Sequence, residues 1–259
     1  MLNLLFSGRS WFLLAVLGAT VMVAPLRAAT FSTNPLADAT MATGPTGDLY
    51  TNNYGAGGAV AVSAAALAKG EFQSVLRFDT SGAKTLFDGL YGSGLWTIQS
   101  VSLQLSPGTV NNAIFNANSA GNFNVRWLQN DSWTEGAGTP SVPTQTGITY
   151  ASLTNTFINL LADEVLGTYA YNGSSSGTFT YNLTLTANFN ADLLAGNLAS
   201  LRLDAADNLV SYLFSSRTFG TVANRPVFTI VAVPEPRTLS LFAVGSVSLA
   251  MFARRQSRA

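Results

Sequence analysis

Histidine and cysteine are both absent from this 259-residue chain. Their absence excludes Ser-His-Asp and Cys-His catalysis, and it excludes zinc sites built from imidazole or thiolate ligands. Disulfides are excluded as well, although a domain of about 200 residues can bury a sufficient core without them. Any catalysis would therefore have to use paired carboxylates, lysine or tyrosine.

Charged side chains are also scarce, at 10% of the residues. The whole chain is formally neutral, but residues 29–232 contain 12 Asp or Glu against seven Lys or Arg, a net charge near −5. Nucleic-acid affinity rests on Lys and Arg that neutralise phosphates, so we expect no nucleic-acid partner. Abundant Asn, Ser, Thr, Gly and Ala with so few charges are typical of an exported surface protein.

The first 29 residues have the three regions of a secretory signal peptide. Arg9 supplies the positive start, residues 11–24 form an apolar run, and small residues follow. We expect the Sec machinery to export the chain and signal peptidase to cleave it after Ala28 or Ala29. An uncleaved N-terminal anchor is the alternative.

The last 27 residues carry three ordered features. The motif Val233, Pro234, Glu235 and Pro236 comes first, and 16 uncharged residues, 238–253, follow it. As a helix that run would be about 24 Å long, slightly short of the ~30 Å core of a bilayer. A basic end closes the chain, with Arg254, Arg255 and Arg258.

This tail, residues 233–259, resembles the PEP-CTERM sorting signal of Gram-negative bacteria, which exosortase transpeptidases recognise. The resemblance implies a single transient membrane helix, an exosortase partner, and release to the cell surface or the extracellular matrix. The positive-inside tendency holds the three arginines in the cytoplasm, so residues 30–232 would lie outside the inner membrane. An ordinary tail-anchor helix is the alternative.

Short strand-like segments fill the exported region. Residues 178–186 alternate clearly, with Phe179, Tyr181 and Leu183 on one face and threonine or asparagine on the other. Together the segments predict an all-β fold, a single antiparallel β-sandwich of jelly-roll type. The predicted strands are 59–62, 73–78, 98–105, 123–128, 178–186, 198–203, 210–215 and 226–231. Helix is expected only in short pieces at 64–67, 160–166 and 191–194.

A second resemblance covers residues 38–230. It rests on Asp38-Ala39-Thr40, Asn53-Tyr54-Gly55, Val75-Leu76-Arg77-Phe78-Asp79, Asp131-Ser132-Trp133-Thr134-Glu135 and Arg225-Pro226-Val227. Their order resembles the DNRLRE-type domain, a jelly-roll family similar to carbohydrate-binding modules and found on exported bacterial proteins. The chain departs from the family pattern in two places. Residues 137–150, rich in Thr, Pro and Gly, look like an insertion, and Val227 replaces the apolar residue usual in the closing strand.

Asp131, Trp133 and Glu135 form the clearest candidate site. Two carboxylates beside an aromatic are the groups that a glycosidase uses on a sugar. The resemblance favours a structural loop instead, in which the indole packs on the sandwich and Glu135 bonds to backbone or arginine. For a charged partner we expect Arg77 or Arg126.

No metal cofactor is predicted, although Asp38, Asp48 and Asp204 have the hard oxygen ligands that structural calcium prefers. Aromatic side chains in loop-like segments could stack on sugar rings. These are Tyr50, Tyr54, Tyr91, Trp96, Tyr169 and Tyr171.

The sequence as a whole favours a non-catalytic surface or matrix protein that an exosortase sorts and cleaves, with extracellular polysaccharide as a candidate partner. One alternative is a polysaccharide lyase or glycosidase that uses carboxylates. The other is a purely structural coat protein that binds no ligand.

Overall fold

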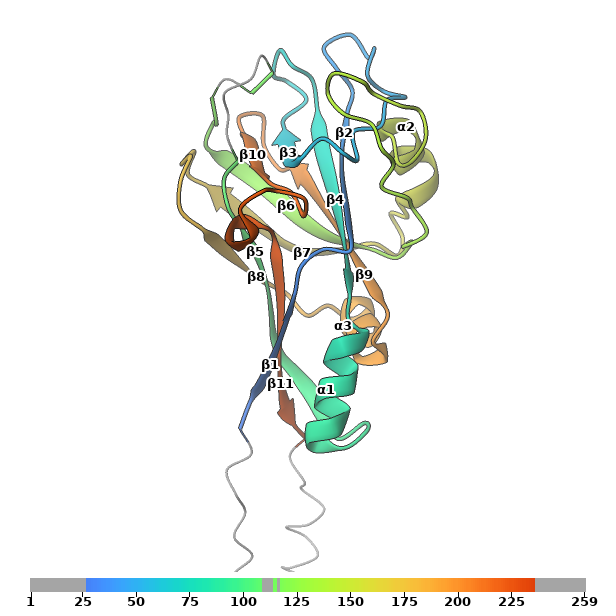
Figure 1. The fold of residues 1–259 in the computed structure, drawn as a ribbon, viewed down its shortest axis with the longest axis vertical. Helices are drawn as coiled ribbons and strands as arrows, with labels where there is room; N and C mark the ends of the chain where they lie inside the picture. The colour runs from blue at the N-terminus through green and yellow to red at the C-terminus, as the bar shows by residue number, and fades with distance from the viewer. Residues whose placement is uncertain (1–26, 109–113, 116, 236–259) are drawn as a thin grey trace, which may run out of the picture.

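Two antiparallel β-sheets dominate the computed structural model, which describes residues 27–108, 114–115 and 117–235 (Figure 1). The four-stranded sheet has the order β1 (Ala29–Thr33), β11 (Val227–Pro234), β5 (Trp96–Leu105) and β8 (Phe179–Leu183). The seven-stranded sheet runs β10 (Ser211–Ser215), β3 (Ala59–Ser63), β4 (Phe72–Asp79), β9 (Leu198–Ala205), β6 (Gly121–Leu128) and β7 (Glu164–Tyr171), and β2 (Ala37–Ala42) pairs with β4. The predicted all-β architecture is confirmed, and each of the eight predicted strands corresponds to an observed one.

The main core lies between the two sheets. Leu103 of β5 stands opposite Phe228 of β11, and the Phe228 ring stacks on Phe78 of β4 at 4.8 Å between ring centroids. All three side chains are completely buried. This contact joins the sheets because the inward residues of alternating strands meet there.

The outer face of the seven-stranded sheet is covered as well. All six residues of β2 are buried, and Met41 packs there with Val75 and Trp133 in a second apolar cluster. The sequence pattern did not reveal β2, because its residues are small or polar apart from Met41, although all six are buried. β1 and β7 were likewise not predicted.

The helices differ most from expectation. α1 (Ser81–Tyr91) was not predicted, whereas the piece expected at 191–194 lies within α3 (Ala187–Ala195). The other two helix predictions are wrong: residues 64–67 form turns, and residues 160–166 hold a turn followed by the start of β7. The remaining helical pieces are short: α2 (Tyr150–Ser152), the π-helical turn Leu153–Phe157 and the 3₁₀ turn Val222–Asn224.

Both ends of the described chain meet at one tip of the sandwich. β1 and β11 are antiparallel neighbours, with Ala29 opposite Ala232, and α1 lies at the same end (Figure 1). Long loops gather at the opposite end, which we call the loop end. In the part of the chain described here, no helix is long and apolar enough to cross a membrane. The predicted signal peptide and tail lie outside that part, except for residues 27–29 and 233–235.

Candidate functional site: an apolar pocket at the loop end

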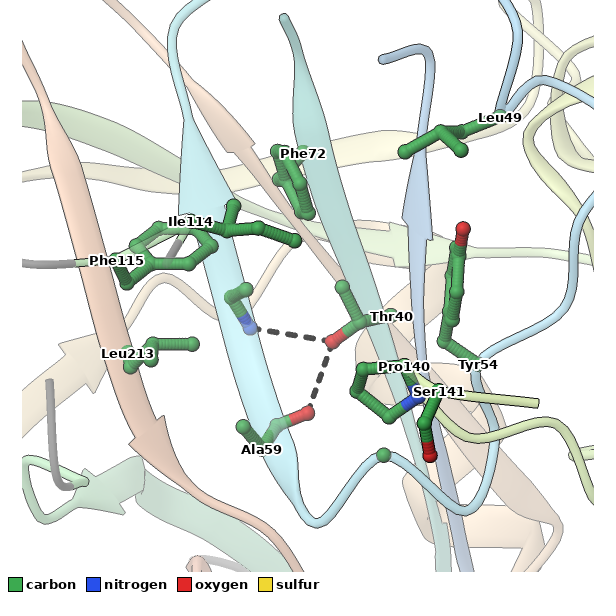
Figure 2. A pocket seen from close by; sticks show the side chains of 12 residues that line it. Thr40, Leu49, Tyr54, Ala59, Phe72, Ile114, Phe115, Pro140, Ser141 and Leu213 are labelled. Carbon is green, nitrogen blue, oxygen red and sulfur yellow. Dashed lines mark hydrogen bonds between the residues drawn. The ribbon is translucent and has the colours of Figure 1, made fainter. Parts of the chain in front are cut away.

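A pocket of about 460 Å³ opens on the outer face of the seven-stranded sheet (Figure 2). Its strand residues are Thr40, Ala59, Ala61, Phe72 and Leu213, from β2, β3, β4 and β10. Its loop residues are Leu49, Tyr54, Gly57, Ile114, Phe115, Pro140 and Ser141. Three loops that are far apart in the sequence therefore close over one patch of sheet.

Side-chain hydroxyls shape the floor of the pocket, because β3 separates from β4 there while it stays paired with β10 along its whole length. β3 and β4 are paired only at Ser63 and Phe72. Further along, the Thr40 hydroxyl donates to the carbonyl of Ala59 at 2.9 Å and accepts from the N–H of Ala61 at 3.2 Å (Figure 2). The small alanine side chains leave the space above them open.

The chemical character of the pocket is apolar. No Asp, Glu, Lys or Arg is among its lining residues. The Thr40 hydroxyl is already hydrogen-bonded to backbone, and the Tyr54 hydroxyl accepts from the Asn52 side-chain amide at 3.2 Å. The pocket can therefore hold an apolar group, but it offers no acid–base pair for catalysis.

A second hollow of about 500 Å³ adjoins the pocket and shares Leu49, Phe72 and Ile114 with it. Lys69 borders this hollow, with its ammonium 4.1 Å from the centre of the Phe115 ring and donating to the Ser211 hydroxyl at 2.9 Å. Burial lowers the pKa of Lys69. The two hollows together place one cation beside an apolar pocket.

The predicted site residues Asp131, Trp133 and Glu135 lie on a loop that is fastened to the sheet. Trp133 is 1% exposed and its indole N–H donates to the Ser200 hydroxyl at 2.9 Å. Arg77 lies over the indole at 4.7 Å and donates to the carbonyls of Asp131 and Trp133 at 2.6 and 2.7 Å. This is the packing that a structural loop requires, because a buried indole cannot stack on a ligand.

The charged partner of Glu135 is Arg217, so the expected partners Arg77 and Arg126 were wrong. The Arg217 guanidinium donates from Nε at 2.9 Å to one carboxylate oxygen of Glu135 and from a terminal nitrogen at 2.5 Å to the other. Arg126 pairs with Asp204 at 2.9 Å. The pairing of Glu135 and Arg217 was missed because 82 residues separate them.

Asp38 adds a second carboxyl to the same cluster. It is 2% exposed and accepts the backbone N–H of Arg217 at 2.5 Å. Burial raises the pKa of Asp38 to about 7, against the lowering effect of that hydrogen bond. Burial likewise raises the pKa of Asp131 to about 6. These shifts arise from packing, and the Asp38 carboxyl is too enclosed to reach a substrate.

Asn53 ties the loop to the rest of the molecule. Its buried amide donates to the carbonyls of Glu135 and Ile148, both at 2.7 Å, and accepts the N–H groups of Gly55 and Gly138, both at 3.1 Å. The chains approach so closely that a Cβ on Gly138 would lie 1.8 Å from the Asn53 carbonyl oxygen. The segments around Asn53 and Trp133 thus meet in space.

The aspartates considered for calcium have separate environments. Asp38 bonds to Arg217, Asp204 pairs with Arg126, and Asp48 accepts from Thr46 at 3.2 Å. Within the described ranges, no group of three or more potential metal ligands is found.

Part of the predicted sorting motif belongs to the sheet. Val233 and Pro234 end β11 opposite Thr97 and Trp96, and the N–H of Glu235 donates to the carbonyl of Leu95 at 2.9 Å. β11 therefore ends two residues after position 232. Pro236 and the basic residues Arg254, Arg255 and Arg258 lie outside the described residues.

Comparisons with known proteins identify no family. No family model matches the chain, and no curated protein matches it. A solved structure described as Desmodium yellow mottle tymovirus matches with a TM-score of 0.24 and 7% sequence identity, covering 91% of this chain and 95% of that one. A likeness at that level carries no argument about function.

Proposed function

We propose that this chain is an exported, non-catalytic surface or matrix protein of a Gram-negative bacterium. The signal peptide directs export, and an exosortase recognises the tail at Val233 to Pro236 and cleaves it from the domain. The domain then presents the loop-end pocket to the surroundings, with extracellular polysaccharide as the candidate ligand.

The strand order supports a jelly roll that resembles carbohydrate-binding modules. Without β2, β3 and β10, the sheets reduce to β1-β11-β5-β8 and β4-β9-β6-β7. These are two four-stranded antiparallel sheets, the arrangement of an eight-stranded jelly roll. The three remaining strands support the pocket floor and the loops around it.

The observation that carries the proposal is the position of the two chain ends. Ala29 stands opposite Ala232, so the expected cleavage site of the signal peptide and the start of the sorting motif lie at one tip. The pocket is lined by residues of β2, β3 and β10, strands that lie toward the loop end in Figure 1. A domain held at that tip would present the pocket away from its attachment point.

The environments of the carboxylates support a non-catalytic role. Glu135 is held by Arg217, Asp38 is enclosed, and one carboxylate oxygen of Asp131 is buried. In a glycosidase, the two carboxyl groups must face a bond that a substrate can reach. These residues therefore give no support to the alternative that the protein is a glycosidase or lyase.

The pocket offers a place where a sugar could bind. Of the six aromatic residues that the sequence offered for stacking on sugar rings, Trp96 and Tyr171 are buried, whereas Tyr50, Tyr54, Tyr91 and Tyr169 are partly exposed. Among these, Tyr54 lines the pocket. The pocket suits the apolar face or an apolar substituent of a polysaccharide.

The sorting step is tested by the intact mass of the mature protein from the cell surface and the medium. We expect a C-terminus near the sorting motif, and we expect Pro234→Ala combined with Glu235→Ala to leave the precursor in the inner membrane. Neither substitution removes the backbone bond between Glu235 and Leu95, so the domain should still fold. Thr97→Ala, opposite Val233 in the sheet, is the matched control and should be processed normally. Normal release of the double variant would refute the sorting proposal.

The ligand step is tested by filling the pocket. Ala59→Phe places a ring over the floor and should abolish retention of the protein on insoluble polysaccharides such as cellulose and chitin. Ala170→Phe, at an exposed position of β7, is the control and should change nothing. If the unmodified protein is retained on none of these polymers, and still alters cell aggregation, the purely structural coat protein is favoured instead.

A further inference from the structure

The tip where the chain ends meet carries exposed leucines. Leu86 and Leu90 of α1 are 38% and 57% exposed, and Leu95, just after the helix, is 42% exposed. Leu86 and Leu90 are four residues apart, so they lie on one face of the helix. We call these three side chains the leucine tip.

α1 holds the leucine tip rigidly. Phe87 is fully buried and its ring lies 5.0 Å from that of Trp96, measured between centroids. The Trp96 indole donates to Asp88 at 2.8 Å, and Asp88 also pairs with Lys84. The two charges of α1 thus neutralise each other, and neither opposes contact with an apolar or anionic surface.

The leucine tip is directly connected to the start of the tail. The carbonyl of Leu95 accepts the N–H of Glu235, and only Pro236 and Arg237 separate Glu235 from the uncharged run 238–253. Three extended residue steps span at most about 10 Å. The headgroup layer on each side of a bilayer is about 5–8 Å thick, so a tail that spans the bilayer keeps Leu95 in that layer or within a few ångströms of it.

We propose that the leucine tip rests in the headgroup layer of the membrane that holds the tail, and that it orients the domain before sorting. Apolar side chains on a short helix reach about 5–10 Å into this layer. Contact at Leu90 and Leu95 keeps the β5–β11 end, and with it the sorting motif, at the membrane surface, while the pocket points outward. This inference rests on the membrane tail of the proposed function.

The absence of cysteine makes the test direct, because an introduced cysteine is the only one in the chain. Leu90→Cys, Leu95→Cys and the control Val142→Cys are each labelled with an environment-sensitive fluorophore. Val142 is 68% exposed on the loop that lines the pocket, so it reports the loop end. The full exported chain, made in a host without exosortase, is reconstituted into vesicles of phosphatidylethanolamine and phosphatidylglycerol. Circular dichroism checks that each variant is folded.

Two readouts distinguish insertion of the tail from contact of the leucine tip with the bilayer. Flotation with the vesicles reports insertion of the tail, and quenching by lipids spin-labelled near the headgroup reports contact of the label with the bilayer. We expect flotation of all three variants and about twofold quenching at positions 90 and 95 only, as for side chains held at interfacial depth. Flotation with equal quenching at all three positions overturns the inference and leaves the tail intact. Failure to float overturns the predicted tail, and the inference with it. A blue-shifted emission without lipid quenching shows contact with a second copy and overturns the inference.

Discussion

Replacing Trp133 with alanine should strongly destabilise the domain. Removing a buried tryptophan costs about 3–5 kcal/mol, and this indole is 1% exposed. The change also leaves the fully buried Ser200 hydroxyl without its donor and removes the ring under Arg77, which adds about 1 kcal/mol or more. Because neighbouring effects are not additive, we expect a total loss of about 4–6 kcal/mol in the free energy of unfolding.

A loss of that size is easy to measure. In a domain of about 200 residues, each kcal/mol lowers the melting temperature by about 2–4 °C, so a fall of about 10–20 °C is expected. Chemical denaturation of the signal-processed protein, followed by circular dichroism, gives the free energy directly. Trp133→Phe is the matched control: it keeps an aromatic ring and loses the hydrogen bond, and it should cost about 1–3 kcal/mol. A loss below about 1 kcal/mol for alanine, within the range of ordinary surface substitutions, would refute the structural role and revive a ligand-binding role for Trp133.

Two further predictions concern the network around the same loop. Asn53→Ala removes four hydrogen bonds to backbone and should lower the free energy of unfolding by about 3–5 kcal/mol in the same denaturation assay. Asn52→Ala, whose amide bonds to the Tyr54 hydroxyl, is the control and should cost less than about 1 kcal/mol. Equal losses for the two variants would contradict the argument. In the folded protein the pKa of Asp38 is raised from 3.8 to about 7, so the folded state binds this proton more tightly than the unfolded chain does. The contribution of Asp38 to the free energy of unfolding should therefore fall as the pH rises from about 4 to about 7. Asp38→Asn should flatten that slope because an amide does not titrate, and its oxygen can still accept the Arg217 N–H. An unchanged slope would show that Asp38 does not titrate in this window.

Strands could be predicted from alternation, as in β8, or from a short apolar run, as in β10, whose five residues are all buried. In 178–186 the apolar and polar residues alternate, and the prediction locates β8. β2 could not be found in either way, because its six buried residues are small or polar apart from Met41. α1 was missed because Gly82 and Gly89 lower its helix propensity, and its stability comes from packing of Ala83 and Phe87 on the sandwich.

The candidate site was predictable only in part. An isolated tryptophan in a polar loop indicates an anchor, and Trp133 is buried. Its surroundings depend on residues far away in the chain, since Arg217 lies 82 positions from Glu135 and Ser200 lies 67 positions from Trp133. No local pattern specifies such partners, because the sheet register decides which side chains meet.

By itself, the sequence determined the all-β class, the positions of eight strands and the exclusion of histidine and cysteine chemistry. These properties depend on composition and on short-range alternation, which act along a few residues of chain. Only the tertiary structure decided that Thr40, Ala61 and Leu213 would line one pocket, that Arg217 would bind Glu135, and that Leu95 would hold Glu235 at the tip beside α1. Those contacts arise because the pairing of distant strands brings together groups that no stretch of sequence contains.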